Sequence, residues 1–127
     1  KAHLSKEHIE EALEKIFDEN DHFIIYESGD SLDGFMLLKE TSGKEPNHDK
    51  QWDISNFIYA SEDIASKTLE KAEDYVKKFS NNPIIRATFF SFEEADIEFF
   101  RSKRYEEKKT PGEFNRIQKY VFTKAHF

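Results

Sequence analysis

The sequence predicts one α/β (α+β) domain, residues 1–127, built on a single mixed, twisted sheet of about six strands with helices on both faces. An apolar strand over 52–60, a helix over 61–79 and a second apolar strand over 84–90 follow one another, which is the pattern of a βαβ crossover between parallel strands. The length of 127 residues and the aromatic content of 15% are sufficient for one hydrophobic core.

The chain before this crossover unit predicts a helix and a hairpin. Ser5 is a suitable N-cap for a helix whose apolar residues recur at helical spacing, namely Ile9, Ala12, Leu13, Ile16 and Phe17. Strands over 22–27 and 35–40 flank a turn-rich segment, which predicts an antiparallel hairpin with a loop longer than the tightest types. The polar segment 41–51 predicts an exposed loop, and its His48 has no metal-binding spacing to another His, so we expect no metal site.

The crossover helix and the chain after it predict the rest of the core. The helix over 61–79 carries a buried stripe that consists of Ala65, Leu69, Ala72, Val76 and Phe79. A third helix starts at about Phe92, and the residues expected to point inward from it are Ala95, Phe99 and Phe100. A strand begins near Tyr105, a turn covers 109–115, and the alternating pattern of 116–124 predicts the final strand.

Composition and charge exclude several classes of protein. The chain has no Cys, which excludes disulfides, thiolate metal sites and a Cys nucleophile. The net charge of −7 divides into −10 over residues 1–66 and +3 over 67–127, which argues against nucleic-acid binding. No apolar run is long enough for a membrane helix and no signal-peptide pattern is present, so we expect a cytoplasmic protein that does not enter a membrane. The acidic half either steers a cationic substrate or partner or only provides solubility.

Four segments resemble the GNAT superfamily, the acyl-CoA-dependent N-acyltransferases. FIIYESGDSLDGFMLLKE over 23–40 is similar to the hairpin of that family, and ISNFIYA over 54–60 is similar to its central strand. IASKTLEKAEDYVKKF over 64–79 resembles the helix that receives the pyrophosphate of the cofactor. The segment 84–105 resembles the following strand and the family's "aromatic-Tyr-x-x-x-Gly-Phe" motif. The order of the elements carries most of this resemblance.

The resemblance implies acetyl transfer from acetyl-CoA, as co-substrate, to an amine on a small molecule or peptide, and it also implies roles for residues. The pantetheine arm would pair with the backbone of Phe57, Ile58, Tyr59 and Ala60. The pyrophosphate would accept hydrogen bonds from the N–H groups of Ile64, Ala65, Ser66 and Lys67. The remaining cofactor-binding candidates are Phe100 and, near the nucleotide end, Arg101 and Lys103. The candidates for proton transfer or amine attraction are Asp53, Tyr59 and Tyr105.

The sequence departs from the family in the residues that handle phosphate and protons. The family's glycine-rich phosphate loop is absent, and the segment between Ala60 and Ile64 is several residues shorter, so either the cofactor site is lost or residues are missing from the sequence. The carboxylates of Glu62 and Asp63 stand where the pyrophosphate would bind, and they would repel it. Phe100 stands at the place of the family's Tyr general acid, and a phenyl ring has no proton to give.

These observations predict an N-acetyltransferase. The alternative is a non-catalytic GNAT-like binding or regulatory protein that has lost cofactor binding and contacts a basic partner through its acidic surface. A homodimer is compatible with either alternative, and the sequence does not name the amine.

Overall fold

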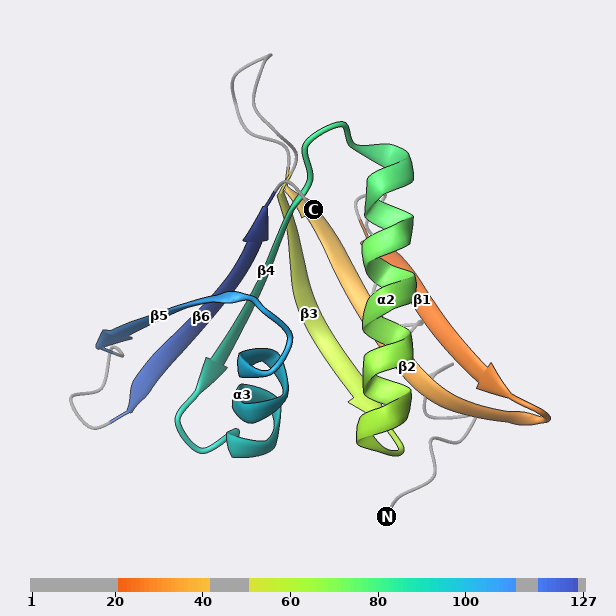
Figure 1. Cartoon of the computed structure of the whole chain (residues 1–127), viewed down its shortest axis with the longest axis horizontal. Helices are drawn as coiled ribbons and strands as arrows, with labels where there is room; N and C mark the ends of the chain where they lie inside the picture. Colours follow the sequence, from red (N-terminus) through yellow and green to blue (C-terminus); the bar gives the residue numbers. More distant parts are fainter. Residues whose placement is uncertain (1–20, 42–50, 112–116, 126–127) are drawn as a thin grey trace.

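The computed structural model describes residues 21–41, 51–111 and 117–125. The elements, in chain order, are β1 (Asp21–Ser28), β2 (Ser31–Thr41), β3 (Gln51–Tyr59), α2 (Glu62–Phe79), β4 (Ile84–Phe90), α3 (Glu94–Arg101), β5 (Glu106–Pro111) and β6 (Gln118–Ala125). The six strands form one sheet in the order β1-β2-β3-β4-β6-β5 (Figure 1). Only β3 and β4 are parallel, and the other four pairs are antiparallel, which confirms the predicted mixed sheet.

The β1–β2 hairpin is longer and its turn is tighter than the sequence analysis predicts. Ser28 pairs with Ser31, so a two-residue turn at Gly29 and Asp30 replaces the expected longer loop. Gly29 has a φ of +61° at the first turn position, where a type II′ hairpin turn requires glycine. The polar residues after Tyr26 belong to the strands, because an irregularity in register between Tyr26 and Glu27 allows the pairing to continue to the turn.

The crossover unit β3-α2-β4 is confirmed. Ser61 is the N-cap of α2, and its Oγ accepts a hydrogen bond from the Ile64 amide. Ala65, Leu69, Ala72 and Val76 are buried as predicted, and Thr68 is buried beside them. Phe79 was expected in the same stripe but is 56% exposed, because it occupies the last residue of the helix.

Both described helices lie on the same face of the sheet (Figure 1). One core cluster contains residues from α2, from α3 and from the strands, with Trp52, Phe100 and Phe122 at 0% exposure. The opposite face carries a smaller cluster around Phe35 and Leu37. The helix predicted over residues 5–17, and with it the prediction of helices on both faces, lies outside the described residues.

The third helix starts later than predicted. It begins at Glu94 rather than near Phe92, and Phe92 is 71% exposed in the turn before it. The shift removes Ala95 from the core, where it was expected, and Ala95 is exposed. Ile97 takes an inward position together with Phe99 and Phe100. The strand expected near Tyr105 is β5, which extends through Pro111 into the segment predicted as a turn.

Arg104 connects α3 to β5 in a left-handed conformation, with a φ of +65°. A non-glycine residue costs of order 1 kcal/mol in this region, because its Cβ crowds the neighbouring backbone. We expect Arg104→Gly to raise the free energy of unfolding by about 1 kcal/mol, despite the extra freedom that glycine gives the unfolded chain. Urea unfolding followed by circular dichroism measures the difference. Arg104→Lys keeps both the Cβ and the charge, so a matching gain in that variant would contradict the explanation.

Candidate active site

The two parallel strands at the centre of the sheet separate toward their carboxyl ends. β3 and β4 pair from Gln51–Ile84 to Ile54–Ala87, and beyond Ile54 the ladder between them ends. In the register of β3 with β2, Ile54 pairs with Leu38 and Asn56 with Leu37, so Ser55 is an extra residue that bulges from the strand. A bulge increases the local twist, so the end of β3 turns away from β4 (Figure 1). The two strands are therefore separated at their carboxyl ends, and we call this separated region of the sheet the opening.

The separated half of β3 presents an open backbone edge to this opening. The amide of Ala60 donates to Asp33 O at 2.9 Å, which places Ala60 among the residues bonded to β2. Alternate residues of an antiparallel strand direct both backbone groups to the same edge, so Ile58 bonds toward β2 while Phe57 and Tyr59 point toward β4. The N–H and C=O groups of Phe57 and Tyr59 therefore face the opening, where β4 no longer pairs with them.

Side chains from β3 and α3 line one face of the opening. The Phe57 ring contacts the rings of Phe99 and Phe100, with centroid distances of 5.8 and 6.1 Å. The Tyr59 ring lies 4.8 Å from Phe57 and 6.0 Å from Phe99. Ile58 lies on the opposite face of the strand and is 43% exposed. Of the four residues expected to hold pantetheine, Phe57 and Tyr59 thus contribute both their open backbone edge and an aromatic wall.

Tyr59 also bridges the opening through its hydroxyl group. The phenol donates a hydrogen bond of 2.7 Å to Asp96 Oδ1 on α3, 37 residues further along the chain. Burial, followed by this hydrogen bond and the nearby charges of Asp96 and Glu62, raises the pKa of the Tyr59 phenol well above its usual value. Tyr59 is therefore protonated at neutral pH, and its proton is directed at a carboxylate.

This arrangement predicts how Tyr59 titrates. A raised folded-state pKa means that the protonated phenol contributes stability, which is complete below the unfolded pKa of about 10 and is lost as the pH rises toward the folded value. Asp96→Asn removes the charge but not the burial, so we expect the pKa of Tyr59 to fall and to remain above its usual value. Ultraviolet titration of tyrosinate in each protein, minus that of the corresponding Tyr59→Phe variant, isolates this residue. An unchanged Tyr59 titration in Asp96→Asn would contradict the assignment.

The amino terminus of α2 borders the opening, but its amides are not free as expected. Ile64 N donates to Ser61 Oγ at 3.3 Å, and Ala65 N donates to Ser61 O at 2.9 Å. Ser66 and Lys67 lie far enough into the helix for their amides to bond to the preceding turn. The resemblance implies that the N–H groups of residues 64–67 hold a pyrophosphate, whereas in the structure the amides of Ile64 and Ala65 already have partners within the protein. Strand β3 passes into the helix through Ala60 and the cap residue alone, so there is no loop that could wrap around a phosphate.

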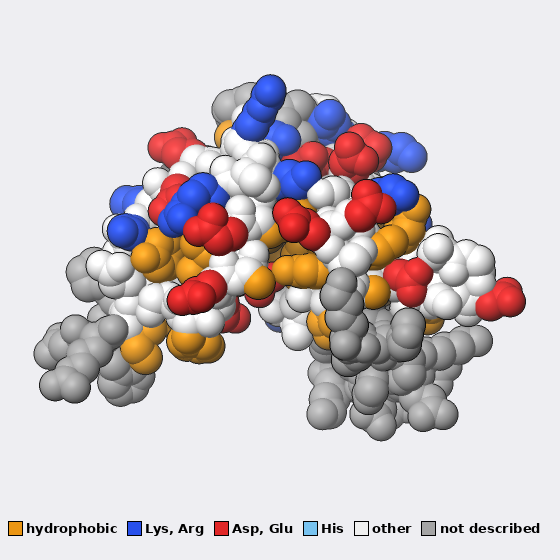
Figure 2. Space-filling model, turned by 60° about the horizontal axis from the view of Figure 1, so that its bottom comes forward, with side chains coloured by type: hydrophobic (Ala, Val, Ile, Leu, Met, Phe, Trp, Pro, Cys, Tyr) orange, Lys and Arg blue, Asp and Glu red, His pale blue; other side chains and the backbone are white. Residues whose placement is uncertain are grey.

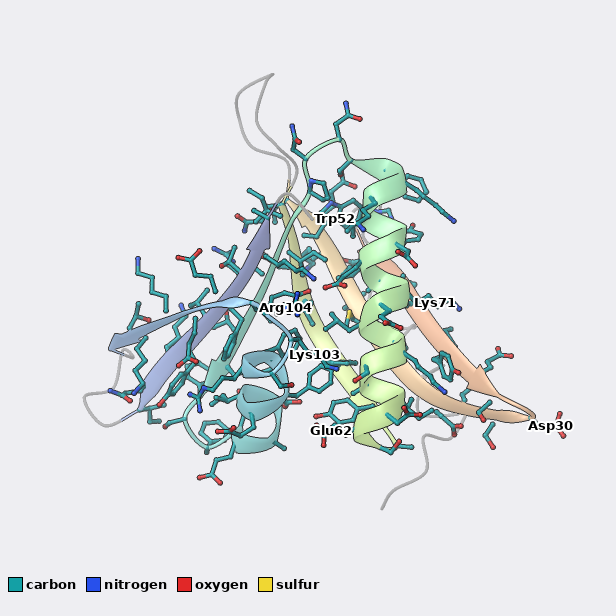
Figure 3. The ribbon with its side chains drawn as sticks, viewed as in Figure 1. Asp30, Trp52, Glu62, Lys71, Lys103 and Arg104 are labelled. Carbon is teal, nitrogen blue, oxygen red and sulfur yellow. The ribbon has the colours of Figure 1, made fainter. Side chains whose placement is uncertain are left out.

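Carboxylates surround this end of the molecule. Glu62 and Asp63 are exposed in the first turn of α2, and Asp63 lies 3.3 Å from Lys67 Nζ. Figure 3 shows Glu62 at the lower end of α2, on the side of α3. Figure 2 turns this end toward the viewer and shows Asp and Glu side chains spread between exposed apolar groups. The rim of the opening is therefore negative, which disfavours a diphosphate and favours a cationic group.

The two basic residues expected near a nucleotide are already engaged within the protein. Arg101 donates to Glu98 Oε1 at 2.7 Å and to Glu107 through two nitrogens, at 2.8 and 3.1 Å. Lys103 lies between α3 and α2 in Figure 3, with its Nζ 5.3 Å from the centre of the Phe99 ring. The Arg101 pair also lowers the pKa of the exposed Glu107. Arg101 can therefore contact a phosphate only if its ion pairs with Glu98 and Glu107 break.

Two of the three predicted catalytic residues do not reach the opening. Asp53 pairs with Arg86 at 3.0 and 3.1 Å in the paired part of the sheet, on the face opposite to Trp52 and Ile54. Tyr105 is 6% exposed, and its hydroxyl donates to Glu73 at 2.8 Å. That hydrogen bond ties β5 to α2.

Tyr59 is the only one of the three predicted catalytic residues that the structure places at the opening. Phe100, at the position of the expected general acid, is fully buried in the core.

Other features of the described residues offer no competing centre. A groove of about 870 Å³ lies between β1 and α2, with Ile25, Lys71 and Tyr75 among its lining residues, and it includes no residue of β3, β4 or α3. In residues 21–41, 51–111 and 117–125, no three His, Asp or Glu side chains gather to hold a metal ion. Neither α2 nor α3 has the length and apolar composition of a membrane-spanning helix. The His48 segment lies outside the described residues.

Comparison with solved structures identifies the fold as that of the GNAT N-acetyltransferases. The chain is similar to the ribosomal-protein-S18-alanine N-acetyltransferase from Escherichia coli, with a TM-score of 0.67 and 10% identity over 98% of this chain and 91% of that one. It is also similar to the aminoglycoside 6'-N-acetyltransferase from Enterococcus faecium, with a TM-score of 0.70 and 13% identity over 91% of this chain and 78% of the other.

A third similar structure is Arabidopsis thaliana Naa50 in complex with the bisubstrate analogue CoA-Ac-MVNAL. Its TM-score is 0.58 and its identity is 18%, over 75% of this chain and 66% of that one. No family model matches the sequence, and no curated protein does. The fold is therefore established by structure, and the chemistry has to be argued from the residues at the opening.

Sequence reasoning missed Asp96. In the segment EEADIEFF it stands beside other acidic residues, and nothing in the local pattern separates it from a solvated helix face. Only the three-dimensional placement of α3 over the opening brings its carboxylate to Tyr59.

Proposed function

We propose that this protein transfers an acetyl group from the thioester of acetyl-CoA to an amine. The observation that supports it is the open backbone edge of Phe57 and Tyr59, where β3 has separated from β4. A pantetheine arm contains two amide groups, and these can pair with an exposed strand edge as a neighbouring strand would. The pantetheine arm fits this site, but the pyrophosphate does not fit the capped and acidic amino terminus of α2.

The reaction needs two proton movements, and in this proposal Tyr59 and Asp96 carry them. The amine nitrogen attacks the thioester carbonyl carbon, the C–S bond breaks, the amine loses one proton and the thiolate gains one. The Tyr59 hydroxyl would protonate the departing sulfur. The Asp96 carboxylate would orient that hydroxyl, attract the cationic form of the acceptor and accept the proton that the amine loses, and this proton would then return to the Tyr59 phenolate. In this proposal Asp53 and Tyr105 maintain the structure and do not contact the reacting atoms.

The test is a transfer assay. The full chain is incubated with acetyl-CoA and a panel of primary amines and amino-terminal peptides, and thiol release is compared with the amount of acetylated amine. We expect release of thiol in equal amount to acetylated product, and a loss of rate of about 10²-fold in Tyr59→Phe. Tyr75→Phe is the matched control, because Tyr75 lies in the groove beside β1. A complete absence of acetylated product across the panel would count against the proposal.

A second candidate is a non-catalytic binding protein that contacts a basic partner. The observation in its favour is the negative rim formed by Glu62, Asp63 and Asp96, together with the engagement of Arg101 by two carboxylates. The amino-terminal acidic residues Glu10, Glu11 and Glu14 lie outside the described residues. Capture of a partner that resists high salt and charge reversal of the rim would exclude this electrostatic mode.

A further inference from the structure

We infer that the site is built for a thioester on a pantetheine-type arm that lacks the nucleotide diphosphate, and that Glu62 and Asp63 set this preference. The inference rests on the proposed function and specifies its donor. Two parts of the same opening lead to it. The edge of β3 that would pair with the arm is open, whereas the positions that would hold the diphosphate are closed or negative.

The first argument is the state of the helix terminus. A helix binds an anion there through amides without a partner and through its dipole. In α2 the Ser61 side chain caps the amide of Ile64, and Ala65 makes the first ordinary helix bond to the Ser61 carbonyl. The amides that remain for an anion therefore belong to Glu62 and Asp63. The first two helical residues, Glu62 and Asp63, carry the carboxylates that complement the positive end of the dipole. The protein itself therefore supplies the anion that this terminus would otherwise bind.

The second argument is that the remaining positive charge is not available to compensate. Lys67 lies 3.3 Å from Asp63 and neutralises one of the two first-turn carboxylates, while Glu62 has no ion-pair partner in the described part of the chain. Arg101 is held by Glu98 and Glu107, and Lys103 Nζ lies 5.3 Å from the centre of the Phe99 ring. A diphosphate, with its two negative charges, would meet a net negative terminus. An uncharged arm would enter the same opening without that repulsion.

The third argument is the position of Glu62 relative to the reacting groups. Its charge contributes to the raised pKa of the Tyr59 phenol, so the carboxylate lies near the opening itself. Figure 3 shows it at the end of α2 beside α3. Glu62 can therefore discriminate between donors that share the same acetyl group and pantetheine arm but differ in charge.

The experiment compares acetyl-CoA with S-acetylpantetheine by isothermal titration to the full chain. In the wild type we expect acetyl-CoA to bind about tenfold more weakly than S-acetylpantetheine, because its diphosphate meets the carboxylates of Glu62 and Asp63. In Glu62→Gln/Asp63→Asn we expect acetyl-CoA to bind about tenfold more tightly, with binding of S-acetylpantetheine unchanged. The gain should shrink in 1 M salt, where charges are screened within about 3 Å.

The matched control is Glu70→Gln/Asp74→Asn, which removes the same charge from exposed positions of the same helix. These positions lie about 10 to 17 Å further along the helix axis, beyond the screening length at physiological salt. We expect no change in the ratio of the two constants in this variant. An equal change in both double variants would overturn the assignment to Glu62 and Asp63.

Two other outcomes separate this inference from the proposed function. If wild-type protein binds acetyl-CoA as tightly as S-acetylpantetheine, or more tightly, the diphosphate is not disfavoured and the inference is wrong, while acetyl transfer stands. If neither thioester binds at millimolar concentration, the proposed function itself is wrong, and the inference falls with it. Circular dichroism of each variant confirms that the helix has formed before the constants are compared.

Discussion

Gly34→Ala is expected to lower the free energy of unfolding by about 3 kcal/mol, because β2 and α2 are packed too closely there for a side chain. A Cβ at Gly34 would overlap Thr68 Oγ1 and would lie 3.1 Å from Ile64 Cγ2 and 3.3 Å from Tyr26 Cβ. Thr68 cannot move aside easily, since it is fully buried and its hydroxyl donates to Ile64 O at 2.7 Å. Urea unfolding monitored by circular dichroism gives the difference.

The clash also has a specific test. Thr68→Ala removes the Oγ1 that the new methyl group would meet, so Gly34→Ala should cost at least 1 kcal/mol less in that background than in the wild type. The rescue is partial, because Ile64 and Tyr26 remain close. An identical cost in both backgrounds would show that the helix does not approach the strand as described. Gly34 also pairs with Tyr59, so the substitution should disturb the opening as well as the stability.

Phe100→Ala is expected to cost about 3–5 kcal/mol, the usual range for a fully buried phenylalanine. Its ring is 0% exposed, and it lies within 6.1 Å of five other rings, counted between centroids: Phe57, Phe89, Phe99, Tyr105 and Phe122. Removing it leaves a cavity where α3, β3, β4 and β6 meet. Since domains of this size are stable by only about 5–15 kcal/mol, the variant should be close to unfolding at room temperature.

Phe92→Ala provides the contrast for this prediction. Phe92 is of the same residue type, eight positions earlier in the chain, but its side chain is 71% exposed and stacks only on the half-exposed Phe90 ring, at a centroid distance of 5.9 Å. We expect its removal to change the free energy of unfolding by less than about 0.5 kcal/mol. Similar losses in the two variants would mean that Phe100 does not occupy the centre of the core.

The crossover unit and its buried stripe could be predicted from sequence because their signal is local. The helical spacing of the apolar residues correctly predicted burial for four of the five stripe residues of α2. Ser61 correctly predicted where the helix begins. The errors in the predicted fold occur where a helix or strand begins or ends at a different residue than predicted. A start of α3 at Glu94 instead of near Phe92 turns Ala95 outward, and strand pairing through Ser28 and Ser31 replaces a predicted loop.

The candidate site could be predicted only in part, because its geometry comes from contacts between distant segments. The resemblance places the candidate site at the end of β3, but the bulge at Ser55 that separates the strand from β4 could not be predicted from the local sequence pattern. Asp53 was a reasonable candidate from the sequence, because its partner Arg86 is 33 residues away. The two residues become neighbours only when β3 and β4 pair in the folded sheet. Asp96 could not be predicted for the same reason, because its carboxylate meets Tyr59 only after α3 has folded over the opening.

The central claim is that the open edge of β3 binds the arm of an acyl thioester, and amide chemical shifts of ¹⁵N-labelled protein test it most directly. On titration with S-acetylpantetheine, we expect saturable shifts in the amides of Phe57 and Tyr59, which face the opening. The amides of Trp52 and Ile54 should move little, because β3 is paired on both sides there. Unchanged Phe57 and Tyr59 amides at millimolar thioester would contradict the claim and leave the fold without a donor site at this opening.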